Sequence, residues 1–180
     1  MIFTEHLIIR PFLETDYSDL HEYLSLEEIY RYEPGEPISL EESRKITAER
    51  AKGSDFWAVT LASNSKKLIG HISLLQTDPD RFLTWEIGFI FSPAFQNKGY
   101  ASEAAGAMIT YAFTELGAHR VVGHCNPENV PSWRVLEKCG MRREGLLRKD
   151  AFFREDKYGN PNWTDTYVYA LLAEDFYSTE

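Results

Sequence analysis

The alternation of hydrophobic and polar residues predicts three consecutive strands in the first half of the chain. The segments 56–61 and 68–75 are rich in β-branched and aromatic residues, and the polar residues 64–67 are expected to form the turn between them. A second turn at 78–80 leads into 82–91, which reads FLTWEIGFIF. The two-residue period of this last segment predicts one face with Trp85, Ile87, Phe89 and Phe91, and another with Thr84, Glu86, Gly88 and Ile90.

Helical spacing of apolar residues predicts two helices before these strands. The apolar run 7–9 is expected to form the first strand, followed by a helix that Thr15 caps. Ser39 and Glu42 have the spacing of a capping box, in which a hydroxyl and a carboxylate each bind a free backbone N–H. A second helix is therefore expected to extend to about residue 52.

The second half of the chain continues with alternating helices and strands. A stripe of apolar residues predicts a helix from about 101 to 116, and 120–124 is expected to form a short strand. Asn129 is expected to cap a short helix that ends at Gly140, and the remainder to form two closing strands. The predicted order is β-α-α-β-β-β-α-β-α-β-β, which is a mixed α/β layer fold.

Composition and charge limit the possible classes of function. The 180 residues carry a net charge of −9 and are 43% hydrophobic, which predicts a single domain, 1–180, with a sizeable core. Because nucleic-acid binding needs a basic face, nucleic acid is not expected as a partner, whereas amines and other cations are attracted. No apolar run approaches the roughly 18 residues that span a bilayer, and the opening lacks the pattern of a signal peptide. A cytoplasmic protein that does not bind membranes is expected.

Ligand chemistry is most evident in residues 96–101, Gln-Asn-Lys-Gly-Tyr-Ala, between a predicted strand and a predicted helix. Gly99 can adopt a positive φ, and the free N–H groups at a helix start favour negative charge. The segment therefore predicts an anion site that a pyrophosphate would fit. Its spacing is neither GxGxxG nor GxxxxGK[ST], which excludes the dinucleotide-binding and P-loop motifs. An ordinary surface turn before a helix is the alternative.

A second motif, together with this loop, gives the chain a resemblance to a known family. Asn129, Ser132 and Gly140 fit N-x-x-S-x-x-x-x-x-x-x-G, the loop fits [QR]-x-x-G-x-[AG], and the opening strand ends in Arg10-Pro11. In this order and spacing the chain resembles the GNAT superfamily of acyl-CoA-dependent N-acyltransferases. Within it, the chain looks like the RimJ/RimL branch, named for acetylation of ribosomal protein N-termini. The resemblance covers nearly the whole chain and implies the GNAT fold, a mixed, mostly antiparallel sheet with flanking helices.

The resemblance also implies a site for acetyl-CoA. In such proteins the fourth strand and the strand after the long helix part like a V, and the pantetheine arm lies in the gap. Asn129 would contact that arm, Ser132 would lie near the thioester sulfur, and the loop would hold the pyrophosphate. The cofactor-binding residues implied are Phe89, Ile90, Phe91, Gln96, Asn97, Lys98, Gly99, Tyr100, Ala101, Asn129 and Ser132. Basic residues between 134 and 149 are candidates for the ribose phosphate, or form a solvated helix face.

Acetyl transfer to an amine needs a base, a polarised carbonyl and a proton for the leaving thiolate. Glu86 is predicted as the base, because related enzymes use a glutamate at this point. Burial against Trp85 and Trp57 would raise its pKa towards neutrality. A carboxylate in a salt bridge or at a strand edge is the alternative. A backbone N–H near Ile90 is the expected donor to the carbonyl oxygen.

The chain departs from the family pattern at position 136. Many members use a tyrosine as general acid seven residues after the helix-start asparagine, where this chain has Leu136. Ser132 is the predicted substitute, either relaying a proton to the sulfur or stabilising the thiolate. Capping of the helix is the alternative role for this serine.

Two other chemistries find little support in the sequence. The five histidines form no HxxxH or HxH spacing, so no metal is expected. Cys139 has no evident histidine partner and lies at a predicted helix end among apolar residues. A buried structural thiol is therefore expected there rather than a nucleophile.

The sequence thus predicts an acetyl-CoA-dependent N-acetyltransferase in which an amine attacks directly within a ternary complex. The preferred acceptor is the α-amine of a protein or peptide, such as a ribosomal protein N-terminus. One alternative is a small-molecule amine, such as a polyamine, an amino acid or an aminoglycoside. Another is a non-catalytic sensor of acyl-CoA, which the missing tyrosine favours. The sequence does not distinguish an acetyl donor from a longer acyl donor. It is also compatible with a monomer and with a homodimer.

Overall fold

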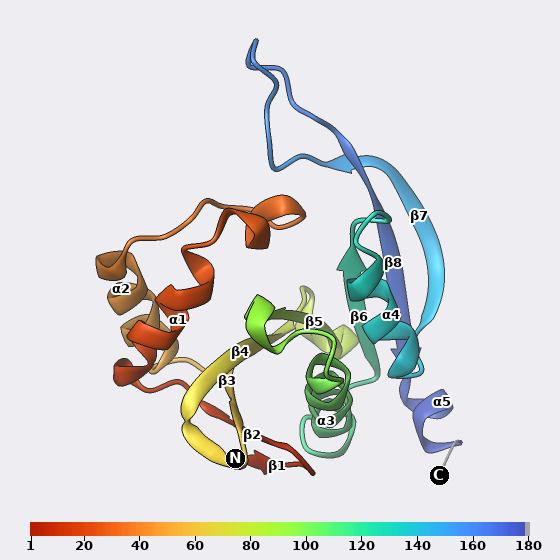
Figure 1. Ribbon diagram of the computed structural model, residues 1–180. Coiled ribbons are helices and arrows are strands. Elements are labelled where there is room, and N and C mark those ends of the chain that lie inside the picture. Colours follow the sequence, from red (N-terminus) through yellow and green to blue (C-terminus); the bar gives the residue numbers. More distant parts are fainter. Residues whose placement is uncertain (179–180) are drawn as a thin grey trace.

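One mixed sheet forms the centre of residues 1–178, the part of the chain that the computed structural model describes (Figure 1). The strands lie in the order β1-β2-β3-β4-β5-β6-β8-β7. Neighbouring strands are antiparallel except β5 and β6, which run parallel. The prediction of a mixed, mostly antiparallel sheet is therefore confirmed. The strands are β1 (Ile2–Phe3), β2 (Leu7–Pro11), β3 (Phe56–Leu61), β4 (Asn64–Gln76), β5 (Thr84–Phe91), β6 (Arg120–Cys125), β7 (Arg142–Ala151) and β8 (Thr164–Leu172).

Helices cover both faces of this sheet (Figure 1). The first two helices pack on one face, and the third and fourth pack on the other. The predicted order of elements is confirmed, and the structure adds β1 and α5. Both are missing from the prediction because two and five residues are too few to display a period. The helices are α1 (Tyr17–Leu24), α2 (Leu40–Arg50), α3 (Tyr100–Thr114), α4 (Val130–Lys138) and α5 (Ala173–Tyr177).

The predicted alternation along β5 is confirmed. Ile87 and Phe91 are buried with side chains of α3, and Trp85 and Phe89 pack against the same apolar cluster. Ile90 lies on the opposite face, against the cluster beneath α1 and α2. β5 therefore contributes to two cores, one on each side of the sheet.

β5 and β6 are paired over a short distance and then separate. Three residue pairs join them, and the last is Glu86 with Val122. Beyond this pair β5 continues along β4, and β6 continues along β8. At the next position of β6, a Cβ on Gly123 would lie 3.1 Å from Leu136 of α4 and 3.7 Å from Ile87 of β5. Leu136, 1% exposed, therefore occupies the point where the two strands part.

The signals at helix starts are confirmed in one case and wrong in another. The Ser39 hydroxyl accepts a hydrogen bond from the Glu42 N–H at 3.2 Å, and the Ser39 N–H donates to the Glu42 carboxylate at 2.7 Å, which is the predicted capping box. Thr15, in contrast, is not the cap of the first helix. It lies within a 3-10 turn, and Asp16 takes the position before α1 begins at Tyr17.

The predicted turn between β3 and β4 is displaced by about two residues. Residues 64–67 belong to β4, whose pairing with β3 begins at Leu61 and Asn64. Residues 62 and 63 alone form the turn. A two-residue connection keeps the two strands paired up to the turn itself, so the polar residues that follow are part of the strand.

A buried ion pair fixes the start of α1 against β2. Arg10 donates from its two terminal nitrogens to the carboxylate oxygens of Asp16 at 2.8 and 2.7 Å. The Leu13 N–H donates to the same carboxylate at 2.8 Å. The two charged side chains are only 10% and 5% exposed. Because a buried charge without its partner is costly, this pair determines how the chain leaves β2.

Replacement of Asp16 by asparagine should lower the free energy of unfolding by about 3 kcal/mol, since it leaves the Arg10 guanidinium buried without a counter-charge. Urea denaturation followed by circular dichroism measures this. The matched control is Glu41→Gln, which removes an exposed ion pair with Lys45. The Glu41 side chain is 78% exposed and the Lys45 side chain is 68% exposed. The control substitution should change the free energy of unfolding by less than about 0.5 kcal/mol. Equal effects of the two substitutions would contradict the importance of burial.

Candidate active site

A cavity of about 670 Å³ opens where β5 and β6 separate. We call it the larger cavity. The end of β5, the loop before α3 and the start of α4 form its walls. All the predicted cofactor-binding residues except Lys98 line it: Phe89, Ile90, Phe91, Gln96, Asn97, Gly99, Tyr100, Ala101, Asn129 and Ser132. The structure therefore brings together segments that lie up to 40 residues apart in the sequence.

Lys98 is turned towards its own loop. Its ammonium donates to the Ala94 carbonyl at 3.2 Å and lies 5.2 Å from the centre of the Phe95 ring. Lys138 and Arg134 of α4 instead line the larger cavity. The positive charge at the cavity therefore comes from these two residues of α4, which are candidates for the ribose phosphate, and from Arg31 in the connection between α1 and α2.

The loop before α3 has the backbone geometry of an anion site. Gly99 is the N-cap residue of α3 with a φ of 86°, and Asn97 also has a positive φ, 59°. The Gln96 side chain donates to the Phe91 carbonyl at 3.0 Å, which ties the loop to the end of β5. The Gln96 backbone N–H already donates to the Pro93 carbonyl at 3.3 Å. The backbone N–H groups that follow it, at the start of α3, are therefore available to a ligand.

The start of α4 presents two polar side chains to the larger cavity. Asn129 occupies the predicted N-cap position, but its side chain makes no capping hydrogen bond. The Ser132 backbone N–H donates to the Asn129 carbonyl at 3.0 Å, and its partly buried hydroxyl has no hydrogen-bond partner among the described residues. Capping therefore occupies neither side chain, and both remain available to a ligand.

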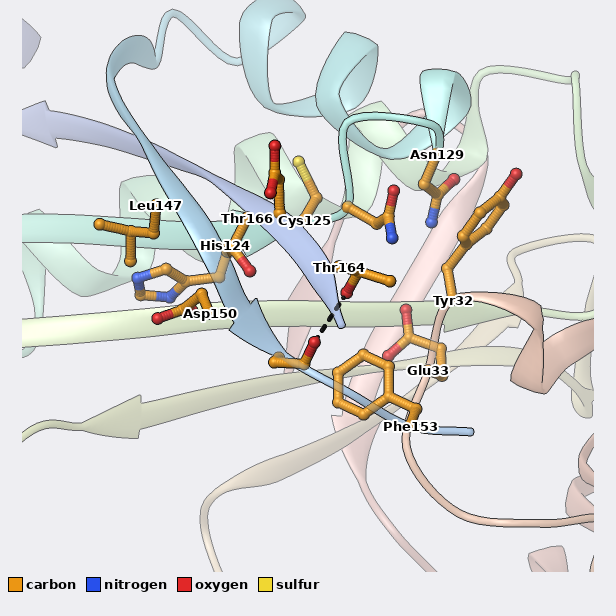
Figure 2. Close-up of a pocket in the computed structure, with 13 residues that line it drawn as sticks. Tyr32, Glu33, His124, Cys125, Asn129, Leu147, Asp150, Phe153, Thr164 and Thr166 are labelled. Atoms are coloured by element: carbon orange, nitrogen blue, oxygen red, sulfur yellow. Dashed lines mark hydrogen bonds between the residues drawn. The ribbon is translucent and has the colours of Figure 1, made fainter. Parts of the chain in front are cut away.

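A second cavity has a volume of about 320 Å³. Figure 2 shows residues that line it. We call it the smaller cavity. Tyr32, Glu33 and Asn129 line both cavities and so mark where they meet. The rest of its wall comes from the end of β6 and from the β7–β8 hairpin, with Thr164 donating to the Ala151 carbonyl at 3.1 Å across the hairpin. Its ionisable residues include His124, Asp150 and Asp165.

Glu86 is paired with a histidine instead of being buried. Its carboxylate lies 3.1 Å from Nδ1 of His124, and the two side chains are 42% and 38% exposed. His124 lines the smaller cavity, whereas Glu86 lines neither cavity. The expectation that Glu86 packs against Trp85 and Trp57 is wrong, because both tryptophans pack on the α3 side of the sheet.

The pairing has an electrostatic consequence for the histidine. The hydrogen bond that the His124 ring donates to the Glu86 carboxylate raises the pKa of His124 above its ordinary value. Since the folded protein holds this proton more tightly, the pair stabilises the fold at low pH. That contribution is lost as the pH rises through the raised pKa of His124.

Glu33 is a candidate that the sequence analysis missed. It lies in the connection between α1 and α2, where neither a period nor a motif marks it. Burial raises the pKa of Glu33 to about 7. Burial likewise raises the pKa of the Cys125 and Cys139 thiols to about 11. Cys139 donates to the Ser102 carbonyl at 3.6 Å, which agrees with the predicted structural thiol.

No group of three or more histidine, cysteine, aspartate or glutamate side chains lies close enough to hold a metal ion in the described part of the chain. None of the helices between residues 1 and 178 is both long enough and apolar enough to cross a bilayer.

These features define an α/β protein whose sheet opens into a ligand cavity with an amide-rich loop at one end. Residues 6–142 match the family model described as "Acetyltransferase (GNAT) domain". Since the match spans most of the chain, the chain belongs to the GNAT acetyltransferases and is an acyltransferase. Enzymes of this family take the acetyl group from acetyl-CoA.

Known relatives agree with this assignment. The chain is 40% identical over 176 residues to the uncharacterized N-acetyltransferase YnaD of Bacillus subtilis (strain 168), with 97% of this chain and 98% of the relative covered. A GNAT acetyltransferase from Bacillus anthracis has a similar crystal structure, with a TM-score of 0.86, 39% identity, and 96% and 98% of the two chains covered.

A more distant structure shows the fold alone. The spermidine N-acetyltransferase of Vibrio cholerae, in complex with CoA and spermine, has a TM-score of 0.79 at 22% identity, with 97% and 99% of the chains covered. The GNAT part of the predicted resemblance is confirmed. The comparisons do not single out the RimJ/RimL branch, which stays a prediction.

Replacement of Glu86 by glutamine should lower the pKa of His124, because the neutral amide no longer favours the imidazolium. Titration of the histidine ring resonances by NMR measures the shift. His71, whose pKa burial holds well below its ordinary value, is the internal control and should keep its chemical shift. An unchanged His124 titration would show that the ion pair is absent in solution.

Proposed function

We propose that this chain transfers an acetyl group from acetyl-CoA to a primary amine, which attacks directly while both substrates are bound. The observation that carries the proposal is the meeting of the two cavities at Asn129 and Glu33, beside the separated ends of β5 and β6. A donor in the larger cavity and an acceptor in the smaller one would bring their reactive groups together there. Positioning two reactants in this way removes much of the entropic barrier to their reaction.

The residues of the larger cavity fit CoA. The end of β5 has main-chain groups on the side facing β6 that can pair with the amides of the pantetheine arm. The N–H groups at the start of α3 suit a pyrophosphate. Arg134 and Lys138 supply positive charge for the ribose phosphate. The bound donor supplies a thioester whose carbonyl carbon the amine can attack.

We propose three roles in catalysis. Glu86 acts as a base through His124, whose ring it orients towards the smaller cavity. Ser132, with its hydroxyl free of capping, provides or relays a proton for the sulfur. The backbone N–H near Ile90 polarises the carbonyl oxygen. Leu136 takes no part, because it is buried where the strands separate.

The acceptor binds in the smaller cavity as a cation, attracted by the carboxylates of Asp150 and Asp165. By its motifs the chain resembles the RimJ/RimL branch, named for acetylation of ribosomal protein N-termini, so the acceptor we propose is the α-amine of a protein or peptide. A small amine, such as a polyamine, is the second candidate, favoured by the same carboxylates. A non-catalytic sensor is not proposed, since the chain belongs to an acyltransferase family. A cytoplasmic location and a monomer or homodimer remain predictions.

Lys138→Gln should weaken CoA binding about three- to fivefold, the effect of one exposed ion pair. Dephospho-CoA, which lacks the ribose phosphate, should bind the variant and the original protein about equally. Isothermal titration calorimetry with both ligands measures this. Lys45→Gln on α2, whose partner is Glu41, is the matched control and should leave both affinities unchanged. Loss of affinity for both ligands to the same extent would contradict the phosphate contact.

Incubation with acetyl-CoA and a mixed pool of amines should give acetylated products detectable by mass spectrometry. The pool contains peptides with the N-termini of ribosomal proteins, polyamines and aminoglycosides. Acetylation of peptide α-amines supports the first acceptor, and acetylation of a small amine supports the second.

Glu86→Gln should cut turnover by roughly 10²-fold while CoA still binds, as loss of a general base does. Unchanged turnover would exclude Glu86 as base, and no product from any amine would contradict the proposed reaction.

A further inference from the structure

The connection that carries Glu33 is fixed by contacts three residues before it, at Tyr30. It lies between α1 and α2 and contains Tyr30, whose ring is buried and whose hydroxyl donates to the Leu24 carbonyl at 2.9 Å. From the β7–β8 hairpin, Arg154 donates to the Tyr30 carbonyl at 2.6 Å. The connection is thus fixed to the core beneath it and to the hairpin across from it. A side chain on a segment that is fixed in this way can act with a defined geometry.

The Glu33 carboxylate lies where the two cavities meet. It lines both of them and is partly buried. Figure 2 shows it between Tyr32 and Asn129 on one side and Phe153 on the other. Among the described residues it makes no hydrogen bond and no ion pair. A carboxylate that is neither solvated fully nor paired is available to a cationic ligand.

The ionisable groups that face Glu33 come from each element around it. His124 and Cys125 lie on β6, and Asp150 and Asp165 lie on the hairpin. From its own connection and from the start of α4, the larger cavity adds Glu28, Arg31, Glu128 and Arg134. None of them forms an ion pair with Glu33 within 4.0 Å among the described residues. Burial is therefore what raises the pKa of this carboxyl.

We propose that Glu33 is a catalytic residue, which binds the ammonium group of the acceptor at the junction of the cavities and takes the first proton from it. This inference rests on the proposed acetyl transfer and adds a step to it. An amine reaches the enzyme as an ammonium ion at neutral pH and cannot attack until it loses a proton.

The electrostatics of the site agree with this role. Burial raises the pKa of Glu33 to about 7, so near neutral pH a substantial fraction of the carboxylate is ionised and can accept a proton. A general base is most effective when its pKa lies near the working pH. An ion pair would have lowered the pKa of the Glu33 carboxyl. The carboxylate would then be a weaker base.

Two protons leave the nitrogen in the reaction, and the site has two groups to receive them. Glu33 takes one from the ammonium, which frees the lone pair. The nitrogen then forms a bond to the carbonyl carbon while the carbon–sulfur bond breaks and its electron pair stays on sulfur. The second N–H proton passes to the Glu86–His124 pair and from there, relayed by the Ser132 hydroxyl, to the sulfur, which becomes the thiol of CoA, so the pair ends the turnover as it began. Glu33 finally releases its proton to solvent, so one proton is released in each turnover.

The test compares pH profiles of kcat/KM for the original protein, Glu33→Gln and the control Glu36→Gln, an exposed carboxylate in the same connection. The acceptor probes are a peptide with an N-terminal alanine and spermidine, and the one that is acetylated is used throughout. In the original protein, activity should rise with pH through an apparent pKa of about 7. Glu33→Gln should lower kcat/KM about 10²-fold and remove the contribution of Glu33 to this rise, leaving only that of the Glu86–His124 pair, while the CoA affinity and the Glu36→Gln profile stay within twofold of the original.

A second variant separates chemistry from folding. Glu33→Ala leaves space for a small carboxylate, and added formate should restore part of its activity, whereas formate should not help Glu33→Gln. Activity of Glu33→Gln within threefold of the original, with the rise near pH 7 retained, would overturn the role of Glu33 and leave the proposed function intact. Absence of any acetylated product with the original protein would overturn both.

Discussion

The short parallel pairing of β5 with β6 is the constraint on which the site depends. Three residue pairs hold the strands together, and Leu136 then fills the point where they part. Because each strand keeps its other neighbour, the separation leaves main-chain groups of β5 facing an opening without destabilising the sheet. The larger cavity, the loop at the start of α3 and the start of α4 all lie around this opening.

The charges that line the two cavities differ. The chain as a whole is acidic, with a net charge of −9, and the larger cavity combines a helix start with three basic and three acidic side chains: Arg31, Arg134, Lys138, Glu28, Glu33 and Glu128. The smaller cavity carries Glu33, Asp150 and Asp165. Under the proposed function, the basic residues of the larger cavity would face the phosphate-bearing donor, and the carboxylates of the smaller cavity would face the cationic acceptor. The departure from the family pattern at position 136 has a structural explanation as well, since a buried leucine there packs against Gly123.

Local patterns predict much of this structure. The alternation along β5, the capping box at Ser39 and the loop from Gln96 to Ala101 depend on neighbours in sequence, and they are found as expected. A single domain spanning 1–180 stays a prediction. Features that depend on contacts between distant segments cannot be predicted from such local patterns. Glu33 acquires its environment only when the α1–α2 connection meets the hairpin, and the partner of Glu86 lies 38 residues away on β6.

The most direct test of the account is a map of backbone amide chemical shifts during a titration with CoA. The account predicts that the largest changes fall at the end of β5, residues 89–91, at the loop and helix start, 97–101, and at the start of α4, 129–132. Residues of the hairpin end, 153–163, should change little. If CoA binds and the largest changes fall in the hairpin or on the α2 side of the sheet, the separation of β5 and β6 is not the cofactor site.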